Sequence, residues 1–104
     1  MNRIRFMLEY NSSPIWIYQD NELLDNGLPE EFASDAELVA LIAKITETFD
    51  SLFENTSISF EYKGFPNNLE KNKFVSMVEQ GIILLKNKMG NKYDVVIDFN
   101  SSIL

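Results

Sequence analysis

The chain has 104 residues, of which 45% are hydrophobic, and it carries a formal net charge of −7. This length and composition predict one globular domain over residues 1–104 and exclude a disordered chain. The chain contains no cysteine and no histidine, which excludes disulfide frameworks, thiolate or imidazole metal sites, and Ser-His-Asp or Cys-His catalysis. We therefore expect no metal, no cofactor and no enzymatic activity.

The sequence shows no targeting or membrane segment. The first ten residues, MNRIRFMLEY, interrupt their apolar run with Arg5 and Glu9, which argues against a signal peptide. The longest apolar runs, LVALIA and GIILL, are too short to cross a bilayer. The lack of cysteine suits a reducing compartment, so we expect a cytoplasmic protein without membrane contact.

The charge is unevenly distributed along the chain. Residues 9–61 carry twelve acidic side chains and one basic side chain, Lys44, whereas residues 63–92 carry six lysines and two glutamates. Direct nucleic-acid binding needs clustered cations, and the acidic excess disfavours it. The same excess favours a basic protein partner, because opposite charges accelerate encounter.

Two strands open the chain. Residues 3–10 alternate, with Ile4, Phe6, Leu8 and Tyr10 predicted on the buried face. The cluster NSSP then predicts a turn, and residues 15–19 (IWIYQ) predict a second strand that completes a hairpin.

Two registers of this hairpin are open. Pairing Tyr10 with Ile15 buries Ile17 and turns Trp16 and Tyr18 outward, and it also sets Arg5 opposite Asp20 and Arg3 opposite Glu22. A slip by one residue buries Trp16 and Tyr18 instead. The first register is favoured because both arginines then have acidic partners across the strands.

The next residues predict a helix and a strand. Ser34 and Glu37 match a capping box that begins a helix, and an apolar stripe extends from Leu38 to Phe53 at helical spacing. Residues 57–62 (SISFEY) alternate again, which predicts a strand with Ile58, Phe60 and Tyr62 inward.

A second helix and a last strand follow. Asn67 and Glu70 match a second capping box, an apolar stripe runs from Phe74 to Met89, and Gly90 marks the end. Gly81 within this stripe predicts close packing on the sheet or on the first helix. Residues 93–99 predict a strand with Asp94, Val96 and Asp98 outward. The order is ββαβαβ, which predicts an α+β two-layer sandwich: a four-stranded, mainly antiparallel sheet with two helices on one face.

The sequence patterns that could indicate a metal site or a catalytic site do not have the spacing that such sites need. Within LLDNGLPEEF (residues 23–32) and its upstream acids, neither register of a calcium loop places acidic ligands and glycine where an EF-hand needs them. Asp94 and Asp98 share a strand face but lie about 13 Å apart along it, farther than paired glycosidase carboxylates. No phosphate loop, dinucleotide fingerprint or nucleophile elbow is present.

Two features predict a partner-binding surface instead. Aromatic anchors within an acidic rim are typical of interfaces, and the favoured register places Trp16 and Tyr18 on the uncovered sheet face near Met7, Glu9, Glu61, Asp94 and Asp98. The competing interpretations are that Trp16 is part of the core or that a terminus covers it. A dense run of carboxylates could also steer a cationic partner. The candidate binding residues are Trp16, Tyr18, Asp20, Glu22, Asp25, Glu30, Glu31 and Asp35.

The segments FMLEYNSSPIWIY, DNGLPEEF and TFDSLFENTSISFEYKGF, which span most of positions 6–65, give the chain a resemblance to the small acidic immunity proteins of bacterial polymorphic and contact-dependent toxin systems. The resemblance implies a cytosolic, non-catalytic protein that binds one cognate toxin. Many such toxins are basic nucleases, whose substrate groove the carboxylates would occlude in place of phosphates. The resemblance transfers no functional residue by position.

Three other interpretations stay open. A small-molecule-binding regulatory module would form a symmetric oligomer and respond to a metabolite. An acidic nucleic-acid mimic would bind several DNA-binding proteins rather than one partner. An enzyme using carboxylates alone would place a carboxyl of raised pKa in a concave pocket. The sequence leaves the oligomeric state, the toxin's activity and the binding face open.

Overall fold

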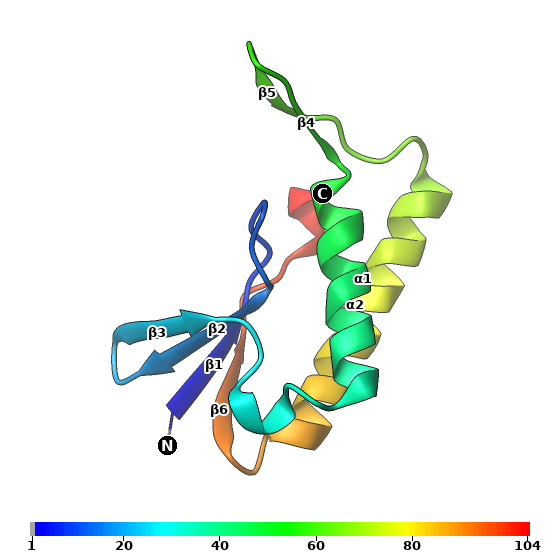
Figure 1. The fold of residues 1–104 in the computed structure, drawn as a ribbon. Helices are drawn as coiled ribbons and strands as arrows, with labels where there is room; N and C mark the ends of the chain where they lie inside the picture. The colour runs from blue at the N-terminus through cyan, green and yellow to red at the C-terminus, as the bar shows by residue number, and fades with distance from the viewer. Residues whose placement is uncertain (1) are drawn as a thin grey trace.

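A computed structural model describes residues 2–104. Its main sheet contains β1 (Asn2–Phe6), β2 (Ile15–Gln19), β3 (Glu22–Asn26) and β6 (Tyr93–Ile97), in the order β3-β2-β1-β6. Two helices, α1 (Ala36–Asp50) and α2 (Asn68–Met89), pack against one face of this sheet (Figure 1). The remaining elements are η1 (Glu30–Phe32), β4 (Phe53–Asn55), β5 (Phe60–Tyr62) and η2 (Ser101–Ile103). The predicted α+β class, with a four-stranded and mainly antiparallel sheet, is confirmed.

The first hairpin buries the predicted face of β2 but in a different register. Ile15 pairs with Phe6 and Ile17 with Ile4, so Arg5 lies opposite Trp16 and Arg3 opposite Tyr18. The predicted pairing of Tyr10 with Ile15 is wrong, and so are the arginine pairs with Asp20 and Glu22. β1 is also shorter than the predicted strand 3–10, because the chain leaves the ladder after Phe6.

The arginines instead face the parallel neighbour of β1. In the β1–β6 register, Arg3 lies beside Asp94 and Arg5 beside Val96. Each arginine forms an ion pair of 3.4 Å, Arg3 with Asp94 and Arg5 with Asp98. Asp94 of β6 and Asp98 just after it therefore neutralise the arginines that the first register assigned to Asp20 and Glu22.

Two strands were placed wrongly or missed. Residues 22–26, for which no strand was predicted, form the edge strand β3 beside β2. The predicted strand 57–62 is reduced to β5, which pairs only with β4 in a separate two-stranded sheet. Ile58 is 93% exposed and Phe60 is 53% exposed, so their predicted inward orientation is wrong. The predicted order ββαβαβ thus lacks β3 and β4.

The helix signals are largely confirmed. Asn67 caps α2 by accepting a hydrogen bond from the Glu70 amide, and the helix ends at Met89, just before Gly90. α1 begins one residue later than predicted, because Asp35 rather than Ser34 is the N-cap and accepts from the Leu38 amide at 3.1 Å. The apolar stripe of α1 ends with Phe49, and Phe53 belongs to β4.

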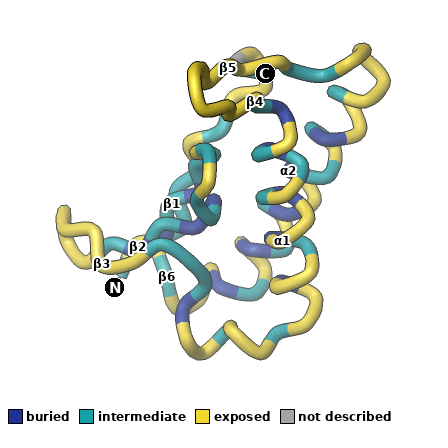
Figure 2. Tube along the Cα trace, turned by 45° about the horizontal axis from the view of Figure 1, so that its top comes forward, coloured by how far each residue is buried: buried dark blue, intermediate teal, exposed yellow. Residues whose placement is uncertain are grey.

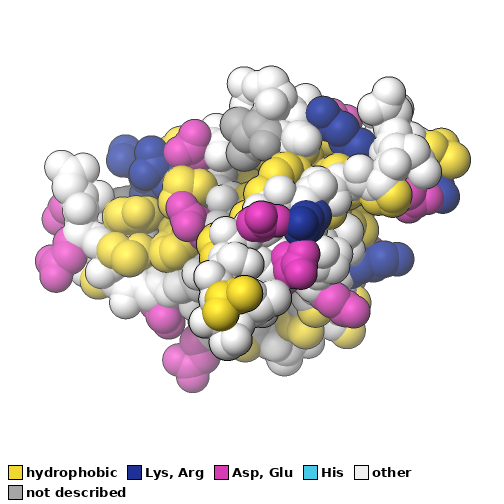
Figure 3. All heavy atoms as spheres, turned by 90° about the horizontal axis from the view of Figure 1, so that it is seen from above, with side chains coloured by type: hydrophobic (Ala, Val, Ile, Leu, Met, Phe, Trp, Pro, Cys, Tyr) yellow, Lys and Arg dark blue, Asp and Glu magenta, His cyan; other side chains and the backbone are white. Residues whose placement is uncertain are grey.

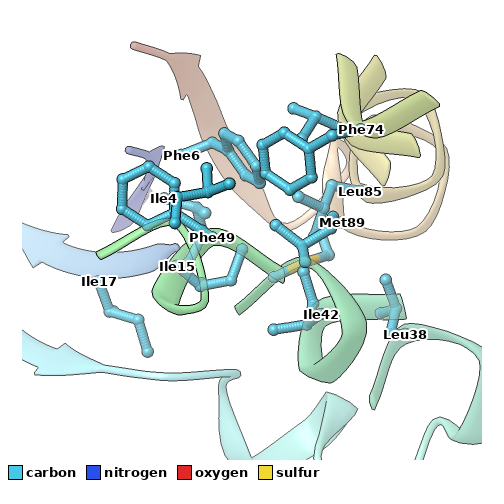
Figure 4. Packing of buried hydrophobic residues seen from close by; sticks show 13 residues of the cluster. Ile4, Phe6, Ile15, Ile17, Leu38, Ile42, Phe49, Phe74, Leu85 and Met89 are labelled. Atoms are coloured by element: carbon cyan, nitrogen blue, oxygen red, sulfur yellow. The ribbon is translucent and has the colours of Figure 1, made fainter. Parts of the chain in front are cut away.

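The core lies between the helices and the inner face of the sheet (Figure 4). Ile4, Phe6, Ile15 and Ile17 contribute from the sheet and pack against apolar side chains of both helices. The other buried hydrophobic residues are Leu38, Ile42, Ile45, Phe49, Leu52, Phe74, Val78, Leu85 and Met89.

Gly81 lets the two helices approach closely. A Cβ atom at this position would lie 3.0 Å from Cδ1 of Ile45 and 3.5 Å from Cδ2 of Leu41. The predicted close packing is therefore confirmed, and its partner is α1. Within residues 2–104, neither helix is long and apolar enough to cross a membrane.

Candidate partner-binding surface

The sheet face opposite the helices carries the two aromatic candidates. Trp16 and Tyr18 alternate with the buried Ile15 and Ile17 along β2, so their side chains project from the other face, where both are half-buried. The predicted outward orientation of both residues is confirmed, and the interpretation of Trp16 as a core residue is wrong. The Trp16 Nε1 donates a hydrogen bond of 3.0 Å to the Met7 carbonyl, which fixes the indole on this face.

The charge on this face is nearly balanced. Arg3 and Arg5 border a shallow hollow of about 270 Å³ that Tyr18 and Asp20 also line. Because the two arginines pair with Asp94 and Asp98, these aspartates do not form the acidic rim that we predicted. Glu61 is absent from this face, since it lies on β5 in the separate hairpin.

The acidic character is instead concentrated on the β2–β3 hairpin. Asp20, Glu22 and Asp25 are exposed there, and none of them forms an ion pair within residues 2–104. Leu23 and Leu24, from the same strand, are 47% and 50% exposed. In Figure 3, hydrophobic side chains over this end of the molecule, at the left, are bordered by acidic ones. We call these five residues the β3 edge patch.

Sequence reasoning missed the leucines of the β3 edge patch. They stand next to each other, so they lack the alternation that marks a half-buried strand. In the structure the register of β3 against β2 shifts between Ile17 and Tyr18, and such an irregularity accommodates consecutive apolar residues at a sheet edge. β3 is also an edge strand, so its outer backbone groups are unpaired within the main sheet.

Asn26 holds the hairpin to the preceding loop. Its Nδ2 donates to the carbonyls of Ser13 and Ile15, at 2.8 and 3.0 Å, and its Oδ1 accepts from the Ser13 amide at 2.9 Å. Gly27, at φ 141°, then redirects the chain toward η1. The patch is therefore presented on a strand whose inner end is fixed.

The other three carboxylate candidates lie elsewhere, and two of them, Glu31 and Asp35, already have partners. Glu31, in η1, accepts a hydrogen bond of 2.6 Å from the Tyr93 hydroxyl, and burial followed by this contact raises the pKa of Tyr93 to about 12. Asp35 caps α1 and binds the Lys88 Nζ at 2.8 and 3.0 Å. Glu30 is exposed beside Glu31.

The Asp35–Lys88 contact shifts the pKa of both side chains. The Lys88 hydrogen bond, followed by that of the Leu38 amide, lowers the pKa of Asp35. Hydrogen bonds to Asp35 and Glu37 raise the pKa of Lys88. This pair connects the beginning of α1 to the last turn of α2, so Asp35 has a clear role in the fold.

The seven clustered acids of residues 20–37 are therefore divided. Asp20, Glu22 and Asp25 belong to the protruding β2–β3 hairpin, whereas Glu30, Glu31, Asp35 and Glu37 lie around η1 and the start of α1 (Figure 1). No group of three or more carboxylates converges on a possible metal position within residues 2–104. Exposed leucines beside carboxylates suit contact with a macromolecule that offers both apolar and cationic groups.

Comparison with known proteins assigns the family. The model of the Serratia CdiI immunity protein-like family matches residues 2–99, nearly the whole chain. The chain belongs to the Serratia CdiI immunity protein-like family. Searches of curated proteins and of solved structures return no match. The resemblance to small acidic immunity proteins is thus confirmed, and membership in this CdiI-like family implies a cognate toxin protein as the partner.

Proposed function

We propose that this protein is a cytoplasmic, non-catalytic immunity protein that binds its cognate toxin and blocks the toxin's active site. The observation that carries the proposal is the family match over residues 2–99. The lack of histidine and cysteine supports a binding role, since the usual general base and thiol nucleophile are missing.

The β3 edge patch is the surface that we assign to this interaction, together with Trp16 and Tyr18 on the adjoining sheet face. Tyr18 lies opposite Leu23 in the β2–β3 register, so the aromatic face and the patch are continuous. Apolar groups at the centre of an interface supply affinity, and surrounding charges supply steering and specificity.

A basic toxin surface fits the patch best. Asp20, Glu22 and Asp25 lie within six residues on one hairpin, and the chain carries a net charge of −7. Carboxylates can occupy positions that a nuclease reserves for substrate phosphates, so we propose a basic nuclease as the toxin and occlusion of its nucleic-acid groove as the mechanism.

The test is inhibition of the cognate toxin, for which a toxin domain encoded immediately upstream of this chain would be the candidate. Equimolar wild-type protein should abolish the nuclease activity of that domain. Toxin activity that stays intact at this ratio would contradict the proposed function.

The contribution of the patch is tested by charge removal. The variant Asp20→Asn/Glu22→Gln should lower the association rate constant about five- to tenfold at low ionic strength, because rim charges act mainly on encounter. Asparagine suits position 20, where φ is 55°. The matched control is Glu47→Gln/Glu79→Gln, which removes the same charge from exposed positions on the two helices. Equal rate constants for the two variants would exclude the patch as the binding surface.

A further inference from the structure

The β4–β5 hairpin protrudes from the body of the protein and belongs to no other sheet. It extends beyond the ends of both helices in Figure 1, and Figure 2 shows it almost entirely exposed. Two-stranded hairpins are only marginally stable in water without further packing. Its presence as an ordered element therefore needs a cause within the fold.

Aromatic packing on one face of the hairpin supplies that cause. Phe53 stacks on Phe60 with ring centroids 5.4 Å apart and contacts Tyr62 at 5.1 Å. Tyr10 reaches both Phe53 and Phe60, at 5.0 and 4.8 Å, and Phe49 of the core contacts Phe53 at 5.2 Å. These contacts join the hairpin to α1 and to the loop after β1.

The turn at the tip of the hairpin is also held in one conformation. The Thr56 amide donates to the Ser59 carbonyl at 2.8 Å, and the Ser59 amide donates back to Thr56 Oγ1 at 3.1 Å. The Ile58 amide donates to the same hydroxyl at 3.4 Å. The tip is thus arranged before any partner binds, which lowers the entropy lost on binding.

Ile58 is the residue that this turn presents. Its side chain is 93% exposed, the highest value among the large hydrophobic residues described. A rigid turn that holds a lone β-branched apolar side chain in water offers a large gain when a partner buries it. Ile83 on α2, which is 60% exposed, lies on a helix surface rather than at a protruding tip.

The charged side chains of the β4–β5 hairpin indicate which kind of partner surface it would fit. Glu54 lies directly opposite Glu61 on the face away from the aromatic rings, an arrangement that is unfavourable by itself. Lys63 Nζ pairs with both carboxylates, and hydrogen bonds to Glu61 and then Glu54 raise the pKa of Lys63. One lysine serves two carboxylates, so this face keeps an acidic excess.

The same glutamates disfavour a second copy of the chain as the partner. Each hairpin strand has three residues with a glutamate in the middle, Glu54 in β4 and Glu61 in β5. Antiparallel pairing of either edge with its own copy, centred on the strand, would set like charges opposite each other. A partner with cationic side chains meets no such repulsion.

We propose that the β4–β5 hairpin is a second toxin-binding element, which inserts Ile58 into an apolar pocket bordered by lysine or arginine side chains on the cognate toxin. This inference rests on the proposed function and adds a contact separate from the β3 edge patch. The two hairpins protrude from different parts of the molecule (Figures 1 and 2), so the toxin would be held at two positions.

The decisive experiment measures binding of Ile58→Asp and Ile58→Ser to the cognate toxin domain carrying a disabling active-site substitution. We expect the dissociation constant to rise at least tenfold for both variants, and more for aspartate. The matched control, Ile83→Asp, should bind within twofold of wild type. Because Ile58 contacts so little of its own chain, its variants should keep the wild-type melting temperature. Binding of Ile58→Asp within twofold of wild type would overturn the proposal.

Further measurements separate the possible outcomes. If wild-type protein itself fails to bind the toxin domain, the proposed function fails, whereas normal wild-type binding with unaffected Ile58 variants removes only the role of the hairpin. Light scattering on the free protein tests self-association, and a dimer that Ile58→Asp dissociates would contradict a toxin pocket as the occupant. The variant Glu54→Gln/Glu61→Gln should slow association several-fold at low salt, and an unchanged rate would contradict the cationic border.

Discussion

The two protruding hairpins both expose apolar and acidic side chains, but different interactions stabilise them. The β2–β3 hairpin extends the main sheet and exposes leucines beside carboxylates, while its inner end is fixed by the Asn26 side chain. The β4–β5 hairpin has no sheet to extend and is stabilised by aromatic rings. The β2–β3 hairpin therefore depends on backbone pairing and on the hydrogen bonds of the Asn26 side chain, whereas the β4–β5 hairpin depends on side-chain packing.

The largest effect is expected from removing the shared ring of the β4–β5 hairpin. Phe53→Ala deletes contacts with rings of the hairpin, the core and Tyr10, and it should lower the free energy of unfolding by about 2–3 kcal/mol, somewhat less than for a fully buried phenylalanine. Urea denaturation measures this change. The control Leu24→Ala, in the exposed β3 edge patch, should stay within about 0.5 kcal/mol of wild type. Equal effects would mean that the two hairpins are stabilised alike.

A smaller effect is expected at the clamp of the β2–β3 hairpin. Asn26→Ala leaves the Ser13 amide and two carbonyls without their side-chain partner, which should cost about 1–2 kcal/mol. Asn26→Asp keeps the acceptor for the Ser13 amide but sets a carboxylate oxygen against the Ser13 and Ile15 carbonyls, so a midpoint in urea at least as low as that of Asn26→Ala is expected. An unchanged midpoint for Asn26→Ala would show that the strand pairing alone holds β3.

The smallest effect is expected from alkaline titration of two groups in and beside the β4–β5 hairpin, Tyr62 and Lys63. Hydrogen bonds to Glu61 and Glu54 raise the pKa of Lys63, and burial raises the pKa of Tyr62. Because the folded state holds these protons more tightly, their stabilisation is complete below about pH 10. It is lost as the pH rises through the raised pKa values.

The variant Lys63→Gln isolates the lysine's share of this titration. Tyr93 titrates in the same alkaline range, so melting temperatures of wild type and variant are compared at about pH 9 and about pH 11. We expect wild type to lose more stability than Lys63→Gln over this interval. Parallel curves would mean that Lys63 contributes nothing through its charge. The β2–β3 hairpin, residues 15–26, contains no lysine to titrate in this way.

The sequence predicted the helices far better than the strand partners. α2 could be predicted because its cap, its apolar stripe and the glycine after it are all local signals. The buried face of β2 could also be predicted, because Ile15 and Ile17 alternate with Trp16 and Tyr18. Their outward orientation placed part of the candidate site correctly.

The register of the first hairpin required information that local sequence does not hold. We assigned Arg3 and Arg5 to acids that follow the next strand, whereas their partners lie on or just after β6, and Arg3 and Asp94 are 91 positions apart in the chain. A parallel neighbour so distant in sequence leaves no local pattern. The predicted arrangement of acidic side chains in the candidate site was wrong for the same reason.

The alternating pattern of β5 led to a wrong prediction of what its apolar face contacts. That face packs mainly on other residues of the same hairpin. Phe60 and Tyr62 do share a face, but that face packs on Phe53 and Tyr10 rather than on the core between sheet and helices. Periodicity identifies a common face and does not identify what covers it. Ile58 followed the pattern and lies in water.

The parallel pairing of β1 with β6 has a consequence for synthesis of the chain. β1 is a central strand, and its second neighbour, β6, comes after the other three strands of this sheet in chain order. A nascent chain on the ribosome can form α1 and the β1–β2–β3 meander early, but β1 stays an open edge of the sheet until residues 93–97 emerge. We therefore expect products of premature termination to expose an unpaired hydrophobic strand edge and to be degraded, so that protection begins only with complete translation of β6.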